Sequence, residues 1–252
     1  MSLYLIGDIH ADWPAAQNAV TTVAQAAPNG ATLVCLGEMG YWPRHLTSGQ
    51  HKVPVWPPEV TVPEHVNFLW IDGNHEDQYQ MIKDGIYHGT TPCPCDTSEG
   101  GIVTYVPRGT VLEIDGAKIL FMGGGDSVPW DKQHRNKKFQ EAMRYFPKKA
   151  VHTWFQEETI SEEQINKAIA NVEAVGGVDI VLSHQPPARF EIPGITPLDP
   201  KEQPSRGWLN TLLMVLEPAH WWFADMHRVC SGETGKTKWR GLAISELLHV
   251  EV

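Results

Sequence analysis

The sequence predicts an α/β protein, and three observations indicate this class. Short apolar runs, each closed by a glycine or a polar turn, recur along the 252 residues and are typical of buried strands. Helical stretches separate several of these runs, a pattern that favours sheets buried on both faces. The middle of the chain adds closely spaced strand-like segments. A chain of this length can form one large domain or two small ones.

The first third of the chain predicts three buried strands and one helix. The strands correspond to the apolar runs at residues 3–6, 33–36 and 66–71. The first run ends at Gly7 and Asp8, and Asp12 then precedes an alanine-rich stretch that reaches Ala27. Asp12 is therefore the expected N-cap of a helix, and Pro14 suits its first turn.

The later elements are less regular. A meander of three paired strands is expected at residues 102–106, 110–114 and 118–122. Helices are expected at residues 135–144 and after Ser161, where Ser161 and Gln164 can form a capping box. Three further strands are expected at residues 178–183, 220–224 and 242–247.

Three long stretches without a regular pattern interrupt these elements, at residues 41–63, 84–101 and 185–207. Loops of this length are uncommon in compact domains and are often functional. Each stretch follows a segment with a cluster of polar residues, so we expect all three to overhang one edge of a sheet. In open α/β sheets, ligands bind at the carboxyl edge of the strands.

The composition of the chain restricts the binding partners and the cellular compartment that we expect. The chain carries 20 Lys and Arg against 30 Asp and Glu, a formal charge of −10, so duplex nucleic acid is not an expected partner. No apolar run approaches the ~18 residues of a membrane span. The amino terminus lacks the basic region of a signal peptide, and the four cysteines are scattered as in proteins with reduced thiols. We interpret the protein as cytoplasmic, without a membrane partner.

Five polar clusters follow predicted strands: Asp8-Ile9-His10, Gly37-Glu38, Gly73-Asn74-His75-Glu76, Ser183-His184 and Asp225-Met226-His227. Each is weak evidence by itself; an aspartate turn with an incidental histidine is the commoner explanation of the first. Together they offer carboxylates, imidazoles and one amide, which suit divalent cations such as Mn²⁺, Fe²⁺ or Zn²⁺. The clusters contain no ligating cysteine, which argues against a structural zinc site.

The order of these clusters resembles the calcineurin-like metallophosphoesterase superfamily, whose signature runs D-x-H, G-D, G-N-H-E or G-N-H-D, an isolated H, and G-H-x-H. The segment from Gly73 to Glu76 matches fully, and Asp8 and His10 match as well. The resemblance extends from Asp8 to His227. It implies one domain over residues 1–252, with a two-sheet β-sandwich flanked by helices in four αββα layers and metals at the carboxyl edge of the strands.

The resemblance also implies roles for individual residues. Asp8, His10 and His227 would hold one metal, and Asn74 and His184 would hold the other. His75 would stabilise or protonate the leaving oxygen. The implied reaction is in-line displacement at phosphorus by a water shared between two metals, without a covalent intermediate. A serine nucleophile is not expected, because Ser183 and His184 are strand neighbours and point to opposite faces.

Two positions depart from the family pattern. Glu38 stands in place of the bridging aspartate and is one methylene longer, which could displace the carboxylate by roughly 1.5 Å. Asp225 stands in place of the first histidine of the last motif, after Ala224 instead of glycine. The additional carboxylate favours harder cations. We therefore expect two divalent metal ions, Mn²⁺ in the first place, with Mg²⁺, Fe²⁺ and Zn²⁺ as alternatives.

Other polar residues are secondary candidates. Asp126 and Ser127, after a run of three glycines, are candidates for the substrate rim, and Arg44 and Arg135 for binding phosphate. The segment 232–237 resembles a phosphate-binding loop, but its two glycines are separated by two residues where that loop needs four. We interpret this segment as a hairpin turn.

The sequence thus predicts hydrolysis of a phosphomonoester or phosphodiester of a small molecule, a nucleotide or a nucleic-acid end. The protein Ser/Thr phosphatase branch is disfavoured, because Ala11 and Tyr41 stand where its motifs have other residues. The alternative is a binding protein that keeps the scaffold without catalysis. Glu38 and Asp225 favour that alternative, and the retained Asn74-His75-Glu76 segment argues against it. The substrate and the oligomeric state are left open.

Overall fold

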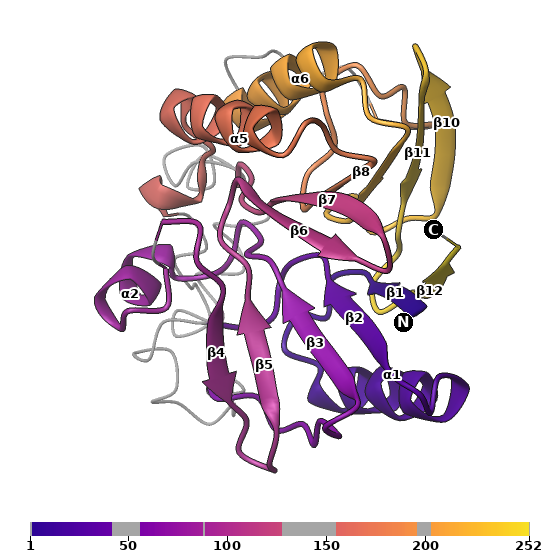
Figure 1. Ribbon diagram of the computed structural model, residues 1–252. Coiled ribbons are helices and arrows are strands. Elements are labelled where there is room, and N and C mark those ends of the chain that lie inside the picture. The colour runs from indigo at the N-terminus through magenta and orange to yellow at the C-terminus, as the bar shows by residue number, and fades with distance from the viewer. Residues whose placement is uncertain (1, 42–55, 88, 128–154, 196–202, 252) are drawn as a thin grey trace.

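The computed structural model describes residues 2–41, 56–87, 89–127, 155–195 and 203–251. Two six-stranded mixed sheets face each other in the described residues, and helices cover their outer faces (Figure 1). The first sheet has the strand order β12-β1-β2-β3-β5-β4, and the second has the order β10-β11-β9-β8-β7-β6. The predicted α/β class and the four-layer arrangement are confirmed.

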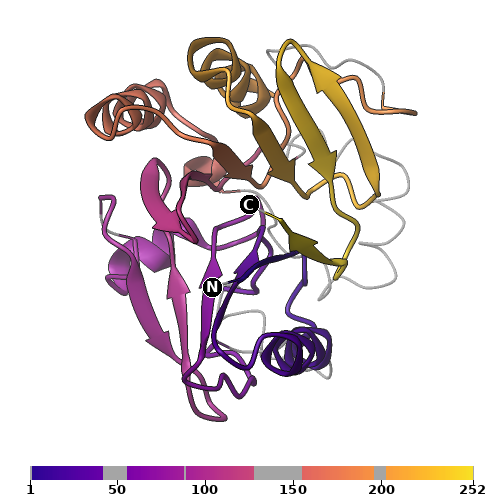
Figure 2. The same ribbon diagram turned by 45° about the vertical axis from the view of Figure 1, so that its right-hand side comes forward.

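The first sheet is built mainly from the amino-terminal half of the chain. Its strands are β1 (Ser2–Ile6), β2 (Ala31–Cys35), β3 (Val66–Trp70), β4 (Cys93–Asp96), β5 (Ile102–Tyr105) and β12 (Leu247–Val250). The four central strands run parallel, and β12 and β4 pair antiparallel at the two edges. Strand β12 brings the end of the chain back beside β1 (Figure 2).

The second sheet follows the same plan. Its strands are β6 (Thr110–Ile114), β7 (Ala117–Met122), β8 (Ile180–Ser183), β9 (His220–Phe223), β10 (Cys230–Thr234) and β11 (Thr237–Gly241). Strands β7, β8, β9 and β11 run parallel, and β6 and β10 are antiparallel edges. The turn between β10 and β11 confirms the hairpin that was expected at residues 232–237.

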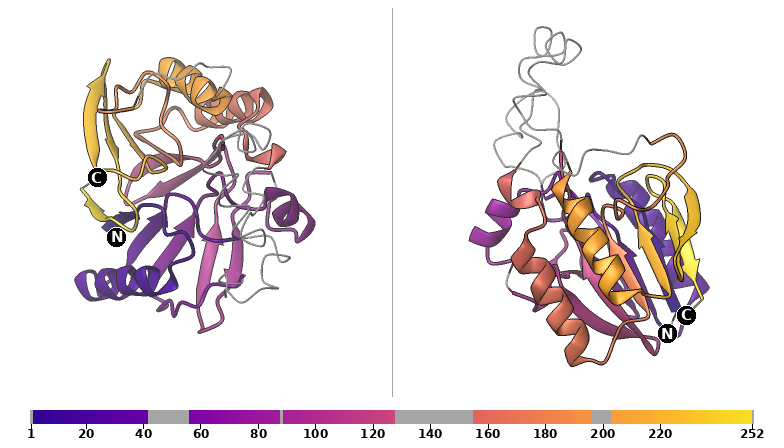
Figure 3. Two further views of the ribbon diagram at one scale, coloured as in Figure 1. Left: turned by 180° about the vertical axis from the view of Figure 1, so that it is seen from behind. Right: turned by 90° about the horizontal axis from the view of Figure 1, so that it is seen from above.

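The helices lie on opposite sides of the sandwich. They are α1 (Trp13–Ala26), α2 (Gln78–Lys83), the short 3-10 helix η2 (Gln156–Glu158), α5 (Glu162–Ala174) and α6 (Pro204–Leu216). Helix α1 packs on the first sheet, and α5 and α6 lie side by side over the second (Figure 3). In the part of the chain that the structure describes, no helix combines the length and apolar character needed to cross a membrane.

Alternation along the strands produces three apolar layers. Leu3 and Leu5 of β1 belong to the layer between the sheets, whereas Tyr4 and Ile6 belong to the layer under α1. A third layer lies between the second sheet and helices α5 and α6. Both sheets are therefore buried on both faces, as the continuous apolar runs predicted.

The expected helix starts at Asp12 and Ser161 are confirmed. The Asp12 side chain accepts a hydrogen bond from the amide of Ala15, 3.0 Å away. The capping box is complete, because the Ser161 side chain accepts from the amide of Gln164 and the Gln164 side chain accepts from that of Ser161. Each pair satisfies amides that the first turn of a helix leaves without a partner.

Several predicted elements were wrong. Residues 102–122 do not form one meander, because β5 belongs to the first sheet while β6 and β7 pair in the second. The strand expected at 242–247 is instead a turn between β11 and β12, in which the amide of Ala243 donates to the Glu246 carboxylate. The stretch 84–101 contains β4, and α6 begins within 185–207. The helix expected at 135–144 lies outside the described residues.

Candidate metal centre

The five polar clusters all lie just after the carboxyl ends of parallel strands. Asp8 and His10 follow β1, Glu38 follows β2, and Asn74 and His75 follow β3. His184 follows β8 of the second sheet, and Asp225 and His227 follow β9. The two sheets meet at this edge, because the amide of Asp225 donates to Asp8 Oδ2 over 2.9 Å.

The backbone at these strand ends is strained. Four of the residues, His10, Glu38, Asp225 and His227, have left-handed φ angles of 46°, 53°, 57° and 52°. Such a conformation costs roughly 1–3 kcal/mol for each non-glycine residue and persists only where surrounding structure enforces it. Sharp turns at these residues keep their side chains at the edge of the sheets.

Two glycines allow the clusters to approach one another. A Cβ atom on Gly37 would lie 2.2 Å from His184 Nδ1, and a Cβ atom on Gly73 would lie 2.3 Å from Glu38 Oε1. Both distances are far below van der Waals contact. The glycines that precede Glu38 and Asn74 are thus required by close packing between the strand ends.

Asp8, His10 and His227 form a first group of possible ligands. One ligand atom from each lies within 4.8 Å of the others. The two imidazoles approach to 3.1 Å between their Nε2 atoms, and His227 Nε2 lies 3.3 Å from Asp8 Oδ2. Asp8 is fully buried, whereas His227 is exposed, so this group faces solvent on one side.

A second group surrounds the fully buried imidazole of His184. Its Nε2 atom lies 2.8 Å from Asn74 Oδ1 and 3.5 Å from oxygens of both Glu38 and Asp225. Glu38 lies between the two groups, with Oε1 toward His184 and Oε2 3.9 Å from His10 Nδ1. All seven expected ligand residues are therefore brought together.

When His184 is neutral with its proton on Nδ1, its Nε2 atom faces another hydrogen-bond acceptor. His184 Nδ1 lies 2.8 Å from the carbonyl oxygen of Leu36, which can only accept, so Nδ1 carries a proton. In neutral histidine Nε2 then has a lone pair, and it points at Asn74 Oδ1, which is also an acceptor. A proton or a cation has to lie between these two atoms.

Two buried carboxylate oxygens of the site also lack a hydrogen-bond donor. Among the described residues, Asp8 Oδ1 and Glu38 Oε2 are buried side-chain atoms without a hydrogen-bond partner. Burial, together with the neighbouring Glu76, raises the pKa of Glu38 well above its usual range. Burial would also raise the pKa of Asp8, but the nearby His184 outweighs it and lowers that pKa. Buried carboxyl oxygens of this kind fit divalent cations, which would favour the ionised form of Glu38.

His75 and Glu76 complete the Gly73 motif. His75 is half-buried, and its backbone amide donates to Glu38 Oε1 over 3.1 Å. The Glu76 carboxylate accepts from the amides of Gly40 and Gly73 and so ties together the loops after β2 and β3. Burial raises the pKa of Glu76 to about 7.

The secondary candidates have other surroundings. The Asp126 carboxylate accepts from the amide and the hydroxyl of Ser205 at the start of α6, each at 2.8 Å. Ser127 Oγ accepts from Asn74 Nδ2, also at 2.8 Å. Arg44 and Arg135 lie outside the described residues.

Sequence reasoning missed three polar residues near the site. Gln185 donates from Nε2 to Asp225 Oδ2 over 3.2 Å, and its Oε1 accepts from the amide of Asp126. Arg108, fully buried, donates to Asp72 just before Gly73. Asp72 could have been found from the sequence, because it is a carboxylate at the end of an apolar run. Gln185 is marked in the sequence only by its place after His184.

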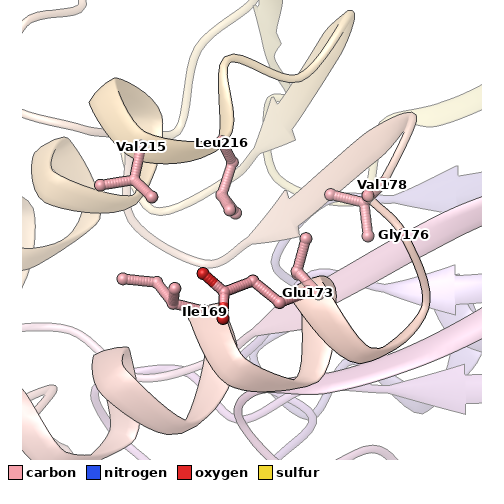
Figure 4. Close-up of a pocket in the computed structure, with 8 residues that line it drawn as sticks. Ile169, Glu173, Gly176, Val178, Val215 and Leu216 are labelled. Atoms are coloured by element: carbon pink, nitrogen blue, oxygen red, sulfur yellow. The ribbon is translucent and has the colours of Figure 1, made fainter.

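A pocket of about 330 Å³ lies elsewhere, between α5, α6 and the start of β8 (Figure 4). Ile169, Val178, Val215 and Leu216 line it, and Glu173 is its one titratable side chain. Val178 precedes β8, whereas His184 follows it, so the pocket lies at the opposite edge of the sheet from the clustered ligands. It lacks a set of groups that could catalyse a reaction.

Comparison with known proteins identifies a family. A family model described as calcineurin-like phosphoesterase matches residues 1–228. Among curated proteins, none matches the chain.

Similar solved structures include phosphopantetheinyl hydrolase (PptH) from Mycobacterium tuberculosis, with 13% identity over 97% of this chain and 90% of that chain and a TM-score of 0.43. The 5'-nucleotidase from Candida albicans SC5314 has 12% identity over 97% of this chain and 45% of that one, with a TM-score of 0.42. The sulfate thiohydrolase SoxB of Thermus thermophilus has 13% identity over 95% and 38%, with a TM-score of 0.41. The chain thus spans less than half the length of the last two proteins.

Proposed function

The chain belongs to the calcineurin-like phosphoesterase family, and from this premise we propose that it hydrolyses a phosphoester with the help of two divalent cations. The observation that carries the proposal is the excess of acceptors at the edge of the sheets. Asp8 Oδ1 and Glu38 Oε2 are buried without a hydrogen-bond partner among the described residues, and His184 Nε2, an acceptor when the imidazole is neutral, faces Asn74 Oδ1 at 2.8 Å. Acceptors arranged in this way favour a cation over a bare site.

Each group supplies ligands to one cation. Asp8, His10 and His227 hold the first, and Asn74, His184 and Asp225 hold the second. Glu38 would supply ligand oxygens to both, because its two oxygens face different groups. When bound, the pair of cations supplies Lewis acidity and lowers the pKa of a water that attacks phosphorus.

The charge of the site favours an anionic substrate. Asp8, Glu38 and Asp225 contribute three negative charges when ionised, and two divalent cations outweigh them by one positive charge. A phosphoester oxygen is therefore attracted to the site. The same three carboxylates favour Mn²⁺ or Mg²⁺ over Zn²⁺, which binds well to nitrogen and sulfur ligands.

His75 acts on the leaving group. Its backbone amide donates to Glu38 and the residue is half-buried, which supports a place for its imidazole at the edge of the site. As general acid it gives a proton to the leaving oxygen, so the product departs as a neutral alcohol or hydroxyl.

The test measures hydrolysis of bis(p-nitrophenyl) phosphate and p-nitrophenyl phosphate with added Mn²⁺, together with the metal content of the same samples. We expect metal-dependent turnover that falls by at least about 100-fold in His75→Ala, the usual range for loss of general acid catalysis, and that is also lost in Asn74→Ala, which removes a ligand of the second cation. The ratio of the two rates distinguishes a diesterase from a monoesterase. No turnover with fewer than two bound cations would contradict the proposal and favour a binding scaffold.

A further inference from the structure

The orientation of the Asn74 amide decides whether the second group can receive a cation. Asn74 Oδ1 faces His184 Nε2 and Asn74 Nδ2 faces Ser127 Oγ, each at 2.8 Å. The two ends of an amide have nearly the same shape but opposite hydrogen-bonding character. A half-turn of the amide would let Nδ2 donate to His184 Nε2 and let Ser127 donate to Oδ1. That arrangement would satisfy His184 Nε2, the Asn74 amide and the Ser127 hydroxyl without a cation.

Ser127 disfavours this half-turn, because its hydroxyl proton has another acceptor when Glu158 is ionised. Ser127 Oγ lies 3.1 Å from Glu158 Oε2, and Glu158 is fully buried. A carboxylate oxygen can only accept, so the hydroxyl donates to Glu158 and keeps a lone pair for the amide. Only the Nδ2 end of Asn74 can donate to that lone pair.

Glu158 is itself held in place. Its carboxylate also accepts from the amides of Ser127 and Phe155. Burial raises the pKa of Glu158 to about 8. In the protonated form, the Ser127 hydroxyl still has the backbone carbonyl of Asn74 as an acceptor, 3.4 Å away. Ser127 therefore keeps a lone pair for Nδ2 while Glu158 is ionised, and in the protonated form as long as the hydroxyl donates to that carbonyl.

The glycines before Ser127 explain how this contact is reached. A Cβ atom on Gly123 would lie 2.1 Å from Asp72 Oδ1, and one on Gly124 would lie 2.7 Å from the carbonyl oxygen of Glu158. The amide of Gly124 donates to the Asp72 carbonyl, and that of Gly125 donates to the Glu158 carbonyl. The glycine run thus allows the chain to pass between these residues and places Ser127 beside Asn74.

We propose that Ser127 is a positioning residue that holds the Asn74 amide with its oxygen toward the second group. The inference rests on the proposed function, since it concerns a ligand of the same site. It assigns Ser127 a role in metal binding in place of the contact with substrate that the sequence suggested.

The test is calorimetric titration of the metal-depleted protein with MnCl₂. The titration identifies the second cation site as the binding step that disappears in His184→Ala, because His184 belongs to the second group. We expect Ser127→Ala to weaken Mn²⁺ binding there by about tenfold, at the lower end of the 10–100-fold effect of groups that orient metal ligands. Ser127→Thr keeps the hydroxyl and should retain most of the affinity.

A double-mutant cycle separates orientation from general structural support. In Asn74→Asp both ends of the side chain are oxygens, so its orientation no longer matters. Adding Ser127→Ala to Asn74→Asp should then change Mn²⁺ affinity little. Equal weakening in both backgrounds would overturn the inference, as would unchanged affinity in Ser127→Ala alone.

The outcomes also distinguish this inference from the proposed function. If the unaltered protein binds Mn²⁺ and hydrolyses phosphoesters but Ser127→Ala binds equally well, only the role of Ser127 is wrong. The unaltered protein keeps all seven candidate ligand residues. If it binds no Mn²⁺, both proposals are wrong.

Discussion

At the scale of single residues, the two departures from the family pattern have different surroundings. Glu38 has a left-handed backbone, and its longer side chain places one oxygen toward each ligand group. Asp225 is oriented by Gln185. The Oε1 atom of Gln185 accepts from the amide of Asp126, so the Nε2 atom of Gln185 points the other way and donates to Asp225. A carboxylate at position 225 accepts this hydrogen bond. The neighbourhood is therefore consistent with oxygen ligands at both positions.

Replacement of this carboxylate should change the choice of metal. In Asp225→His the second cation gains a nitrogen ligand and loses a negative charge, which favours Zn²⁺ over Mn²⁺. We expect the ratio of Mn²⁺ to Zn²⁺ affinity to fall by about tenfold or more, as for other changes close to a metal. Competitive titration measures this ratio, and Asp225→Asn is the control that keeps an oxygen without the charge. An unchanged ratio in Asp225→His would show that residue 225 does not select the metal.

Metal binding should also compete with protons at two histidines. Burial disfavours the charged form of His184, but Asp8 and Asp225 outweigh burial and raise its pKa well above the usual value. The hydrogen bond with Asp8 raises the pKa of His227. A cation binds the deprotonated imidazole, so raised pKa values extend the competition to higher pH. Mn²⁺ affinity should therefore increase as pH rises through the neutral range.

Calorimetry in buffers of different ionisation enthalpy counts the protons that Mn²⁺ releases. We expect release near neutral pH, and less of it in His227→Asn. Binding without proton release would mean that these imidazoles are already deprotonated and that their pKa values are not raised.

At the scale of the elements, a buried ion pair joins the two sheets behind the site. Arg108 lies between β5 and β6, where the chain passes from the first sheet to the second, and Asp72 follows β3. Arg108 donates from Nη2 to Asp72 Oδ2 over 2.6 Å, and Nη1 reaches Gln164 of α5. Tyr105 donates to the other Asp72 oxygen. Asp72 immediately precedes Gly73, so this network supports the loop that carries Asn74.

Replacement of Arg108, the positively charged partner in this ion pair, should destabilise the fold strongly. Arg108→Met leaves the Asp72 carboxylate buried with fewer donors, and loss of one partner of a buried pair costs about 3–5 kcal/mol of unfolding free energy. Chemical denaturation of the metal-depleted protein measures this loss. The double variant with Asp72→Asn should recover part of it.

A surface pair provides the comparison. Lys236 and Glu217 approach to 2.7 Å but are mostly exposed. Lys236→Ala should cost less than about 1 kcal/mol. Similar costs for Arg108→Met and Lys236→Ala would contradict a special role for the buried pair.

The elements differ in how far the sequence predicts them. Strands such as β1 and β8 are buried on both faces, so their apolar runs mark them directly. Strand β4 contains Pro94 and alternates between half-buried and exposed residues, and it depends on pairing with β5 that no local pattern reveals. Helix α6 begins at Pro204 without a side-chain cap and contains Gly207, both of which suggest a loop.

At the scale of the whole molecule, the site exists only when the two sheets are docked. His10 and His227 are 217 residues apart in sequence, yet their Nε2 atoms lie 3.1 Å apart. The ordered motifs in the sequence predict which residues meet, because each motif follows a buried strand. They do not predict contacts such as Ser127 with Asn74 or Gln185 with Asp225, which depend on how loops from different strands pack.

We propose that the docked sheets place seven ligand residues around positions for two cations. The most direct test is a crystal structure of the protein with Mn²⁺, examined by anomalous scattering at the manganese edge. We predict two peaks, one among Asp8, His10 and His227 and the other among Asn74, His184 and Asp225, with Glu38 in contact with both. A single peak, or two peaks without Glu38 between them, would contradict the account.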